Sequence, residues 1–189
     1  MIVSAKRILE LNHKYHLIEN LAEREQNPEG TGLDIRVGEV YRLKGDGFLG
    51  VEERKTPDIE KIADVKEDKE FILKPGDFVL LKTMEKITIP SEKITVDENW
   101  PPMYLMANAY PRSTLQRCGL FLRTTKTDPG YTGELTFGLA NIGPSDVKLE
   151  LGSRIANIVF HGVIGELSRA YNGQWKGGRV STGAQEKQI

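Results

Sequence analysis

The segment from Thr127 to Asn141, TDPGYTGELTFGLAN, places a carboxylate and an aromatic ring on a rigid turn. Asp128-Pro129-Gly130 suits a type I or type II turn, which would hold the carboxylate at a pocket wall. An ordinary aspartate is ionised at neutral pH but is a weak base. It therefore helps only where water is positioned and the electrophile is already activated, as in a metal-bound phosphate. Tyr131 has a ring that can stack against a ligand.

Taken alone, this segment also fits a turn aspartate and an aromatic that covers the core. Other motifs must therefore decide whether Asp128 and Tyr131 belong to a functional site. Arg112-Ser113-Thr114 offers a guanidinium and two hydroxyls that suit phosphate oxygens, or else a structural salt bridge with a hydroxyl cap. Arg117 adds a second cation nearby. Residues 177–183, GGRVSTG, can wrap phosphates with backbone N–H groups or can be disordered. Arg154 is interpreted as structural.

The composition limits the possible functions. A chain of 189 residues with 39% hydrophobic and 28% charged residues fits one globular domain, residues 1–189. The net charge of −1 gives no argument for binding nucleic acid. No apolar run reaches the roughly 18 residues of a membrane helix, and the charged N-terminus is unlike a signal peptide. The single cysteine, Cys118, excludes an internal disulfide, so we expect a cytoplasmic protein.

The pattern of hydrophobic residues predicts the elements that position these groups. Residues 1–25 have helix-like spacing, with Ser4 as a possible cap. Residues 33–37 alternate like a strand, and residues 40–51 fit a strand and a turn. From Phe71 onward, short strands separated by Gly, Pro and Asp turns predict a sandwich or jelly-roll barrel. Residues 52–70 hold 13 charged residues and are predicted to be a charged surface arm or loop. Residues 172–189 are Gly-rich and polar, which predicts a flexible C-terminal tail.

Five segments, in this order along the chain, resemble the motifs of the dUTPase / dCTP deaminase superfamily. They are TGLDIRVG (31–38), PRSTLQRCGL (111–120), TDPGYTGELTFGLAN (127–141), LGSRIAN (151–157) and GGRVSTG (177–183). The N-terminus MIVSAKRILEL also resembles the short N-terminal helix of the deaminase branch. The nearest resemblance is to the archaeal dUTPases grouped within the dCTP deaminase family. Only the charged segment 52–70 falls outside the resemblance.

The resemblance implies an all-β, distorted jelly-roll-like barrel with a short N-terminal helical segment. It also implies a homotrimer with active sites between subunits, and hydrolysis of dUTP to dUMP and pyrophosphate with Mg²⁺ on the triphosphate. Asp128 matches the residue that activates water, Tyr131 the ring under the deoxyribose, and Asp34 an acid near the metal, acting through water. The other substrate-binding residues that it implies are Arg112, Ser113, Thr114, Arg117, Asn157, Lys176, Gly177, Gly178, Arg179, Ser181 and Thr182.

Three positions depart from the family pattern. Gly138 stands where the deaminase branch has the glutamate that moves a proton to the cytosine ring, and Glu134 is roughly 13 Å away along a strand. Asn157 replaces a glutamine, and Arg179 replaces an aromatic that stacks on uracil. We therefore expect a dUTP diphosphatase. A dCTP deaminase, a bifunctional dCTP deaminase/dUTPase and a non-enzymatic nucleotide-binding trimer remain the alternatives.

Overall fold

The computed structural model describes residues 1–188, so Ile189, the last residue of the predicted tail, lies outside it. The chain begins with β1 (Ile2–Val3), α1 (Ala5–Tyr15), β2 (Ile18–Glu19) and the 3₁₀ helix η1 (Glu23–Gln26). Ser4 caps α1, since its hydroxyl accepts a hydrogen bond from Arg7 N–H at 3.3 Å. The helix-like spacing of residues 1–25 thus yields one helix and one 3₁₀ turn. No helix among residues 1–188 is long and apolar enough to cross a membrane.

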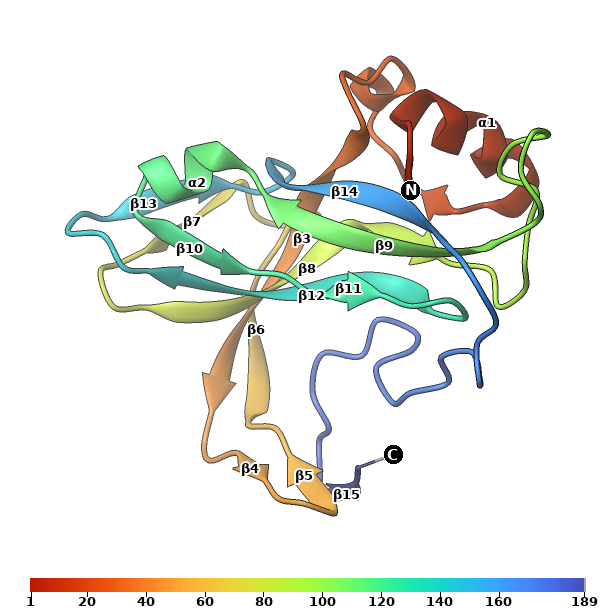
Figure 1. The fold of residues 1–189 in the computed structure, drawn as a ribbon. Coiled ribbons are helices and arrows are strands. Elements are labelled where there is room, and N and C mark those ends of the chain that lie inside the picture. The colour runs from red at the N-terminus through yellow and green to blue at the C-terminus, as the bar shows by residue number, and fades with distance from the viewer. Residues whose placement is uncertain (189) are drawn as a thin grey trace.

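The body of the molecule is one strongly curled antiparallel sheet (Figure 1). Its strands follow the order β10-β12-β8-β3-β14-β9-β11, while β1, β2 and β6 pair at the sides. A separate pair, β7 with β13, extends one end of the sheet. The bounds are β3 (Gly32–Lys44), β6 (Asp58–Asp64), β7 (Glu70–Leu73), β8 (Phe78–Thr88), β9 (Tyr104–Pro111), β10 (Leu120–Arg123), β11 (Lys126–Thr127), β12 (Thr132–Asn141), β13 (Val147–Glu150) and β14 (Arg154–Val163).

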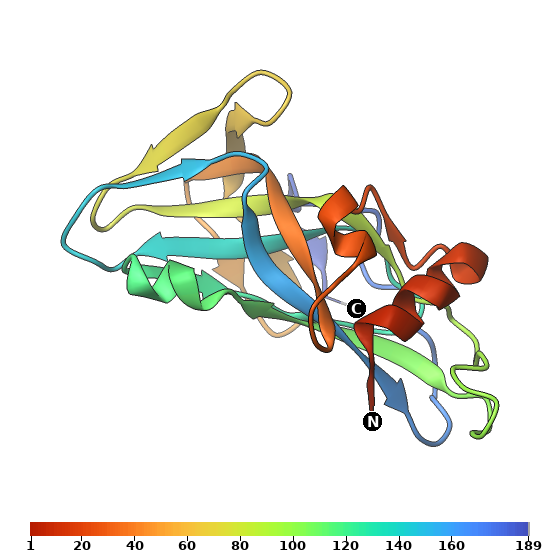
Figure 2. The same ribbon diagram turned by 90° about the horizontal axis from the view of Figure 1, so that it is seen from above.

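Buried and partly exposed residues alternate along the strands, and the buried ones form the core inside the curled sheet. In β12 every second residue from Gly133 to Asn141 is buried, and Phe137 and Leu139 are almost completely enclosed. The short helix α2 (Ser113–Arg117) lies at one end of the barrel and α1 at the other (Figure 1, Figure 2). The predicted fold is confirmed: all-β and jelly-roll-like, with a short N-terminal helical segment.

One hairpin projects from the barrel and carries the end of the chain. It consists of β4 (Phe48–Leu49) and β5 (Glu53–Lys55), and we call residues 45–57 the arm. The last strand, β15 (Glu186–Lys187), pairs with β5 at the tip of the arm (Figure 1). The predicted charged segment 52–70 therefore contains β5 and β6. Within the tail, residues 172–188, the contact at Gly177 is with β12, and Ser181, Thr182 and β15 contact the arm. The flexibility of the tail stays a prediction.

Candidate functional site

The Asp-Pro-Gly-Tyr sequence forms a type II turn. Tyr131 N–H donates to the Asp128 carbonyl oxygen at 3.1 Å, and Gly130 has φ +96°, which the third position of this turn requires. A β-carbon at Gly130 would lie only 2.7 Å from the Tyr171 carbonyl oxygen. Tyr171 N–H in turn donates to the Pro129 carbonyl oxygen at 2.7 Å. The turn is therefore fixed in conformation and docked against the segment that leads into the tail.

A cavity of about 480 Å³, which we call the Asp128 cavity, opens beside this turn. Asp128 is the one carboxylate among its lining residues, and Lys126 and Arg179 are the two cations. Residues of β8 and β12 form part of its wall, and the arm and the tail contribute Thr56 and Trp175. The apolar part of the wall consists of Leu80, Tyr131, Leu135, Tyr171, Trp175 and Val180. The cavity thus combines an apolar surface with a single acid, which suits a ligand with a flat, weakly polar part.

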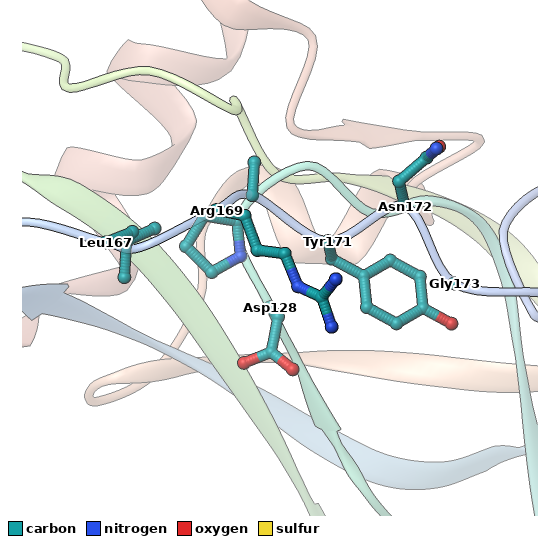
Figure 3. Close-up of a pocket in the computed structure, with 8 residues that line it drawn as sticks. Asp128, Leu167, Arg169, Tyr171, Asn172 and Gly173 are labelled. Atoms are coloured by element: carbon teal, nitrogen blue, oxygen red, sulfur yellow. The ribbon is translucent and has the colours of Figure 1, made fainter. Parts of the chain in front are cut away.

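The Asp128 carboxylate lies at the border of two cavities. Lys126 Nζ donates to its Oδ1 at 2.6 Å, and no hydrogen bond reaches Oδ2 from residues 1–188. Figure 3 shows Asp128 and Arg169 projecting into an adjoining cavity of about 550 Å³ that Tyr171 also lines. Oδ2 is therefore available to hold a water molecule. Sequence reasoning missed Arg169, because it lies in an irregular segment after β14 without a local signal.

Tyr131 is buried and presents its ring rather than its hydroxyl. Its O–H donates to the Glu134 carbonyl oxygen at 2.8 Å, and its ring centroid lies 5.8 Å from that of Tyr171. Burial raises the pKa of the Tyr131 phenol, and the neighbouring Tyr171 and Glu134 raise it further. The phenol therefore remains protonated at neutral pH, and its ring forms a flat apolar wall of the cavity.

Two other side chains of the Asp128 cavity have hydroxyl groups without partners. The Oγ1 atoms of Thr127 and Thr136 are buried and form no hydrogen bond with any residue from 1 to 188. Buried hydroxyls are usually paired, because an unpaired one loses its hydrogen bonds to water without replacement. No hydrogen bond within residues 1–188 therefore uses either hydroxyl.

A second cavity, of about 310 Å³, surrounds Asp34, and we call it the Asp34 cavity. Asp34 Oδ2 accepts from Arg112 Nη1 and, at 2.8 Å, from Arg154 Nη1, while Oδ1 accepts from Asn157 Nδ2 at 3.0 Å. Arg24 also lines this cavity. Burial, together with the charges of Arg154 and Arg24, lowers the pKa of the Arg112 guanidinium. Three guanidiniums and three carboxylates, those of Asp34, Glu25 and Glu29, line this cavity, and Arg24 pairs with Glu25 at 3.1 Å. Arg112 and Arg154 share the single carboxylate of Asp34, so this pair of guanidiniums suits phosphate oxygens.

This arrangement adds two arginines to the residues that the sequence singled out around Asp34. Arg154, interpreted as structural, lies with Arg112 on Asp34, because β14 pairs with β3 and places Asn157 opposite Asp34. Arg24 gave no signal in the sequence, because only the fold brings η1 to this cavity. The structure therefore brings together Asp34, Arg112 and Asn157 and adds two cations.

The side chains do not form a direct magnesium site. No group of three or more His, Cys, Asp or Glu side chains suited to a metal ion occurs among residues 1–188. Both oxygens of Asp34 already accept hydrogen bonds from Arg112, Arg154 and Asn157. Glu25, which also lines this cavity, accepts from Asp34 N–H at 2.9 Å and pairs with Arg24, so these two carboxylates do not offer the several oxygen ligands that a hard cation such as Mg²⁺ prefers.

The other residues that were predicted to bind substrate lie in several separate parts of the structure. Ser113 and Thr114 are exposed in the first turn of α2, and Arg117 lines a different cavity, beyond α2, with Asp146. The tail residues follow two surfaces. Gly177 N–H donates to the Thr132 carbonyl oxygen at 2.6 Å, and Lys176 and Gly178 flank this contact with β12. The hydroxyls of Ser181 and Thr182 bond to the arm instead of the cavity.

The Asp128 cavity and the Asp34 cavity have no lining residue in common. Within one chain, Asp128, whose Oδ2 is available, therefore lines a different cavity from Arg112 and Arg154. An anion held by Arg112 and Arg154 of the same chain would occupy a different cavity from a ligand that contacts Asp128 and Tyr131.

Comparison with known proteins agrees with this fold. A family model described as dCTP deaminase-like matches residues 2–163. A protein named "dCTP deaminase, dUMP-forming" from Dictyoglomus turgidum is 29% identical over 85% of this chain and 80% of its own length. A "Probable deoxyuridine 5'-triphosphate nucleotidohydrolase" from Aeropyrum pernix is 34% identical over 78% of this chain and 83% of its own. Among solved structures, the 2'-deoxycytidine 5'-triphosphate deaminase from Agrobacterium tumefaciens superposes with a TM-score of 0.60 at 18% identity, over 84% of this chain and 48% of that one.

Proposed function

Because the chain belongs to the dCTP deaminase-like family of enzymes, whose members are named both as deaminases and as probable dUTP hydrolases, we propose that it is a dUTP diphosphatase. It hydrolyses dUTP to dUMP and pyrophosphate. The substrate is the magnesium complex of the nucleotide, so that Mg²⁺ arrives on the triphosphate and the protein does not need a metal cluster of its own.

The observation that carries this proposal is the surroundings of Gly138. By resemblance, deamination requires a carboxylate there, yet a β-carbon at Gly138 would lie 2.9 Å from Phe78 Cζ. Glu134, on the same face of β12, is 3.5 Å from Lys82 Nζ and packs against Gly178. Asp128 is thus the one acid lining its cavity, which supports activation of water over proton transfer to a base.

The proposed reaction uses Asp128 as the residue that holds and deprotonates water. The water oxygen forms a bond to the α-phosphorus while the bridging bond between the α- and β-phosphates breaks. The electrons of that bond leave with pyrophosphate, and the water proton passes to Asp128. Phosphoryl transfer depends more on positioning and neutralisation of charge than on a strong base, so a carboxylate of ordinary basicity is sufficient.

The binding roles follow from the two cavities. The Tyr131 ring packs against the deoxyribose, where its flat apolar surface leaves no partner for a 2'-hydroxyl. Arg112 and Arg154, with Ser113 and Thr114 at the start of α2, bind the triphosphate of a substrate held by a neighbouring subunit. A homotrimer with sites between subunits joins the two cavities that one chain keeps separate, and that separation supports the proposal.

A dCTP deaminase, or a bifunctional enzyme, is the second candidate. It is favoured by the deaminase-like N-terminal helix α1 and by the relative named "dCTP deaminase, dUMP-forming". The two candidates differ in one product, because deamination of dCTP releases ammonia and hydrolysis of dUTP does not.

The experiment that separates them compares dUTP and dCTP in parallel, with and without Mg²⁺, and follows both pyrophosphate and ammonia. We expect magnesium-dependent release of pyrophosphate from dUTP and no ammonia from dCTP. Ammonia from dCTP would establish the deaminase. Binding of dUTP without any turnover would instead indicate a nucleotide-binding protein.

A further inference from the structure

The arm holds the tail through a short stretch of sheet. Arg54 pairs with Glu186 and Glu53 with Lys187 in the ladder between β5 and β15. Gln188 N–H extends the ladder by donating to the Glu52 carbonyl oxygen at 2.7 Å. Backbone pairing of this kind fixes the register and direction of the tail along the arm.

A second set of contacts joins the base of the arm to the middle of the tail. Thr56 N–H donates to Thr182 Oγ1 at 3.0 Å, and Thr182 N–H donates back to Thr56 Oγ1 at 2.8 Å. Ser181 Oγ donates to the Pro57 carbonyl oxygen at 3.0 Å. These reciprocal bonds place the tail residue Val180 and its neighbours at the wall of the Asp128 cavity.

Arg54 is at the centre of a third set of contacts between the arm and the tail. Its guanidinium carbon lies 4.8 Å from the centroid of the Trp175 ring, and that of Arg179 lies 5.8 Å from it. Arg54 Nε and Nη2 both lie 3.1 Å from Glu186 Oε1, while Arg179 Nη1 donates to Glu186 Oε2 at 2.8 Å. The Glu186 carboxylate thus bonds to the guanidiniums of Arg54 and Arg179. Both guanidiniums also lie near the Trp175 ring.

Trp175 and Arg179 line the Asp128 cavity, as does Thr56 of the arm itself. We propose that Arg54 is a positioning residue for the reaction: by fixing Trp175 and Arg179, it holds the tail as one wall of the nucleotide cavity. This inference rests on the proposed function, and it gives a role to the charged segment that falls outside the family motifs. Arg54 acts through these two tail residues and has no direct part in the chemistry.

The test compares Arg54→Ala with Lys55→Ala, which removes the same charge from the next residue of β5. Lys55 forms no ion pair with any residue from 1 to 188. For Arg54→Ala we expect the KM for dUTP to rise about tenfold while kcat changes by less than about twofold. Arg54→Lys should give an intermediate KM, because an ammonium keeps the charge but loses the fork that meets Glu186.

A second readout follows the tail without requiring turnover. Trypsin cleavage after Lys176 and Arg179, identified by mass, should become faster in Arg54→Ala than in Lys55→Ala. In a Trp100→Phe background, which leaves Trp175 as the one tryptophan, its emission should shift to longer wavelength in Arg54→Ala. If Arg54→Ala does not fold, Thr56→Val tests the same connection by removing the acceptor of Thr182 N–H.

These measurements distinguish the anchoring role of Arg54, its positioning role and the proposed function from one another. Unchanged cleavage and emission in Arg54→Ala would overturn the anchoring role. Faster cleavage with an unchanged KM would overturn the positioning role. If the wild-type protein does not hydrolyse dUTP, the proposed function fails. Cleavage and emission still decide whether Arg54 anchors the tail, and the KM for dCTP then tests its effect on the cavity.

Discussion

Phe78 lies over Gly138, so that a β-carbon at position 138 would come within 2.9 Å of Phe78 Cζ. The two residues lie on neighbouring strands, β8 and β12, and the ring of Phe78 is half-exposed. The position at which a deaminase needs a carboxylate is therefore covered by an aromatic ring. The absence of a carboxylate at Gly138 supports the proposed phosphate hydrolysis, and the contact with Phe78 can be tested independently of activity.

Gly138→Ala should lower the free energy of unfolding by about 1 kcal/mol, because the added methyl group displaces the Phe78 ring. In a Phe78→Ala background the same change should be neutral or stabilising, since the backbone at residue 138 does not require glycine. Thermal denaturation of the four proteins in this double-mutant cycle measures the difference. Equal effects of Gly138→Ala in both backgrounds would show that Phe78 does not cover this position.

Asp34→Asn should destabilise the protein by about 2 kcal/mol, because Arg112 and Arg154 lose the carboxylate that they share. Pyrophosphate should raise the melting temperature of this variant more than that of the wild type, since both guanidiniums become available to the anion. Asp146→Asn, which removes a charge outside both cavities, is the control. An equal response to pyrophosphate in all three proteins would exclude the Asp34 cavity as an anion site.

Thr127→Val should leave the free energy of unfolding unchanged or raise it by up to about 1 kcal/mol, because the hydroxyl has no partner among residues 1–188. Thr83→Val is the matched control. The Thr83 hydroxyl donates to the Glu85 carbonyl oxygen and accepts from Leu135 N–H, so its loss should destabilise by about 1–3 kcal/mol. Chemical denaturation compares the two. Similar losses in both variants would mean that Thr127 is hydrogen-bonded after all.

The connection between arm and tail should weaken in acid. Burial alone raises the pKa of Glu186, but Arg179 and Arg54, the charged groups that face it, outweigh burial and lower it below the usual glutamate value. A lowered pKa in the folded protein gives stability that is present above the ordinary value near 4.5 and is lost as the pH falls through the folded value. Trypsin is inactive there, so pepsin cleavage and Trp175 emission are the suitable measurements.

Glu186→Gln should remove this acid dependence while leaving the tail more accessible at neutral pH. Its control is Glu52→Gln, because the Glu52 side chain takes no part in the cluster, although its carbonyl oxygen accepts from Gln188 N–H. A wild-type acid transition that persists unchanged in Glu186→Gln would assign it to another group.

The sequence predicted local features better than distant ones. The Asp-Pro-Gly turn and the Ser4 cap depend on neighbouring residues, so their geometry follows from the residue types alone. The two cavities depend on strand pairing and on the course of the tail, which bring residues far apart in the chain together. Arg117 illustrates the limit, because it is close to Arg112 in sequence but lies at the other end of α2.

The roles of tail hydroxyls were equally inaccessible to sequence reasoning. Ser181 and Thr182 fit a phosphate loop by residue type. Yet Ser181 Oγ donates to the Pro57 carbonyl oxygen of the arm, and Thr182 Oγ1 accepts from Thr56 N–H. Nothing local in a Gly-rich segment indicates which distant strand it will pair with. The assignment of these two residues to substrate remains a prediction, whereas their contacts with the arm belong to the fold.

In the proposed reaction, Asp128 activates the water that hydrolyses dUTP. The most direct measurement is the rate of pyrophosphate release from magnesium dUTP by Asp128→Asn, with Asp146→Asn as a matched control. We expect kcat to fall by a factor of at least about 100 in Asp128→Asn, with dUTP still bound, and to be unchanged in the control. Turnover at the wild-type rate in Asp128→Asn would show that Asp128 does not activate the water.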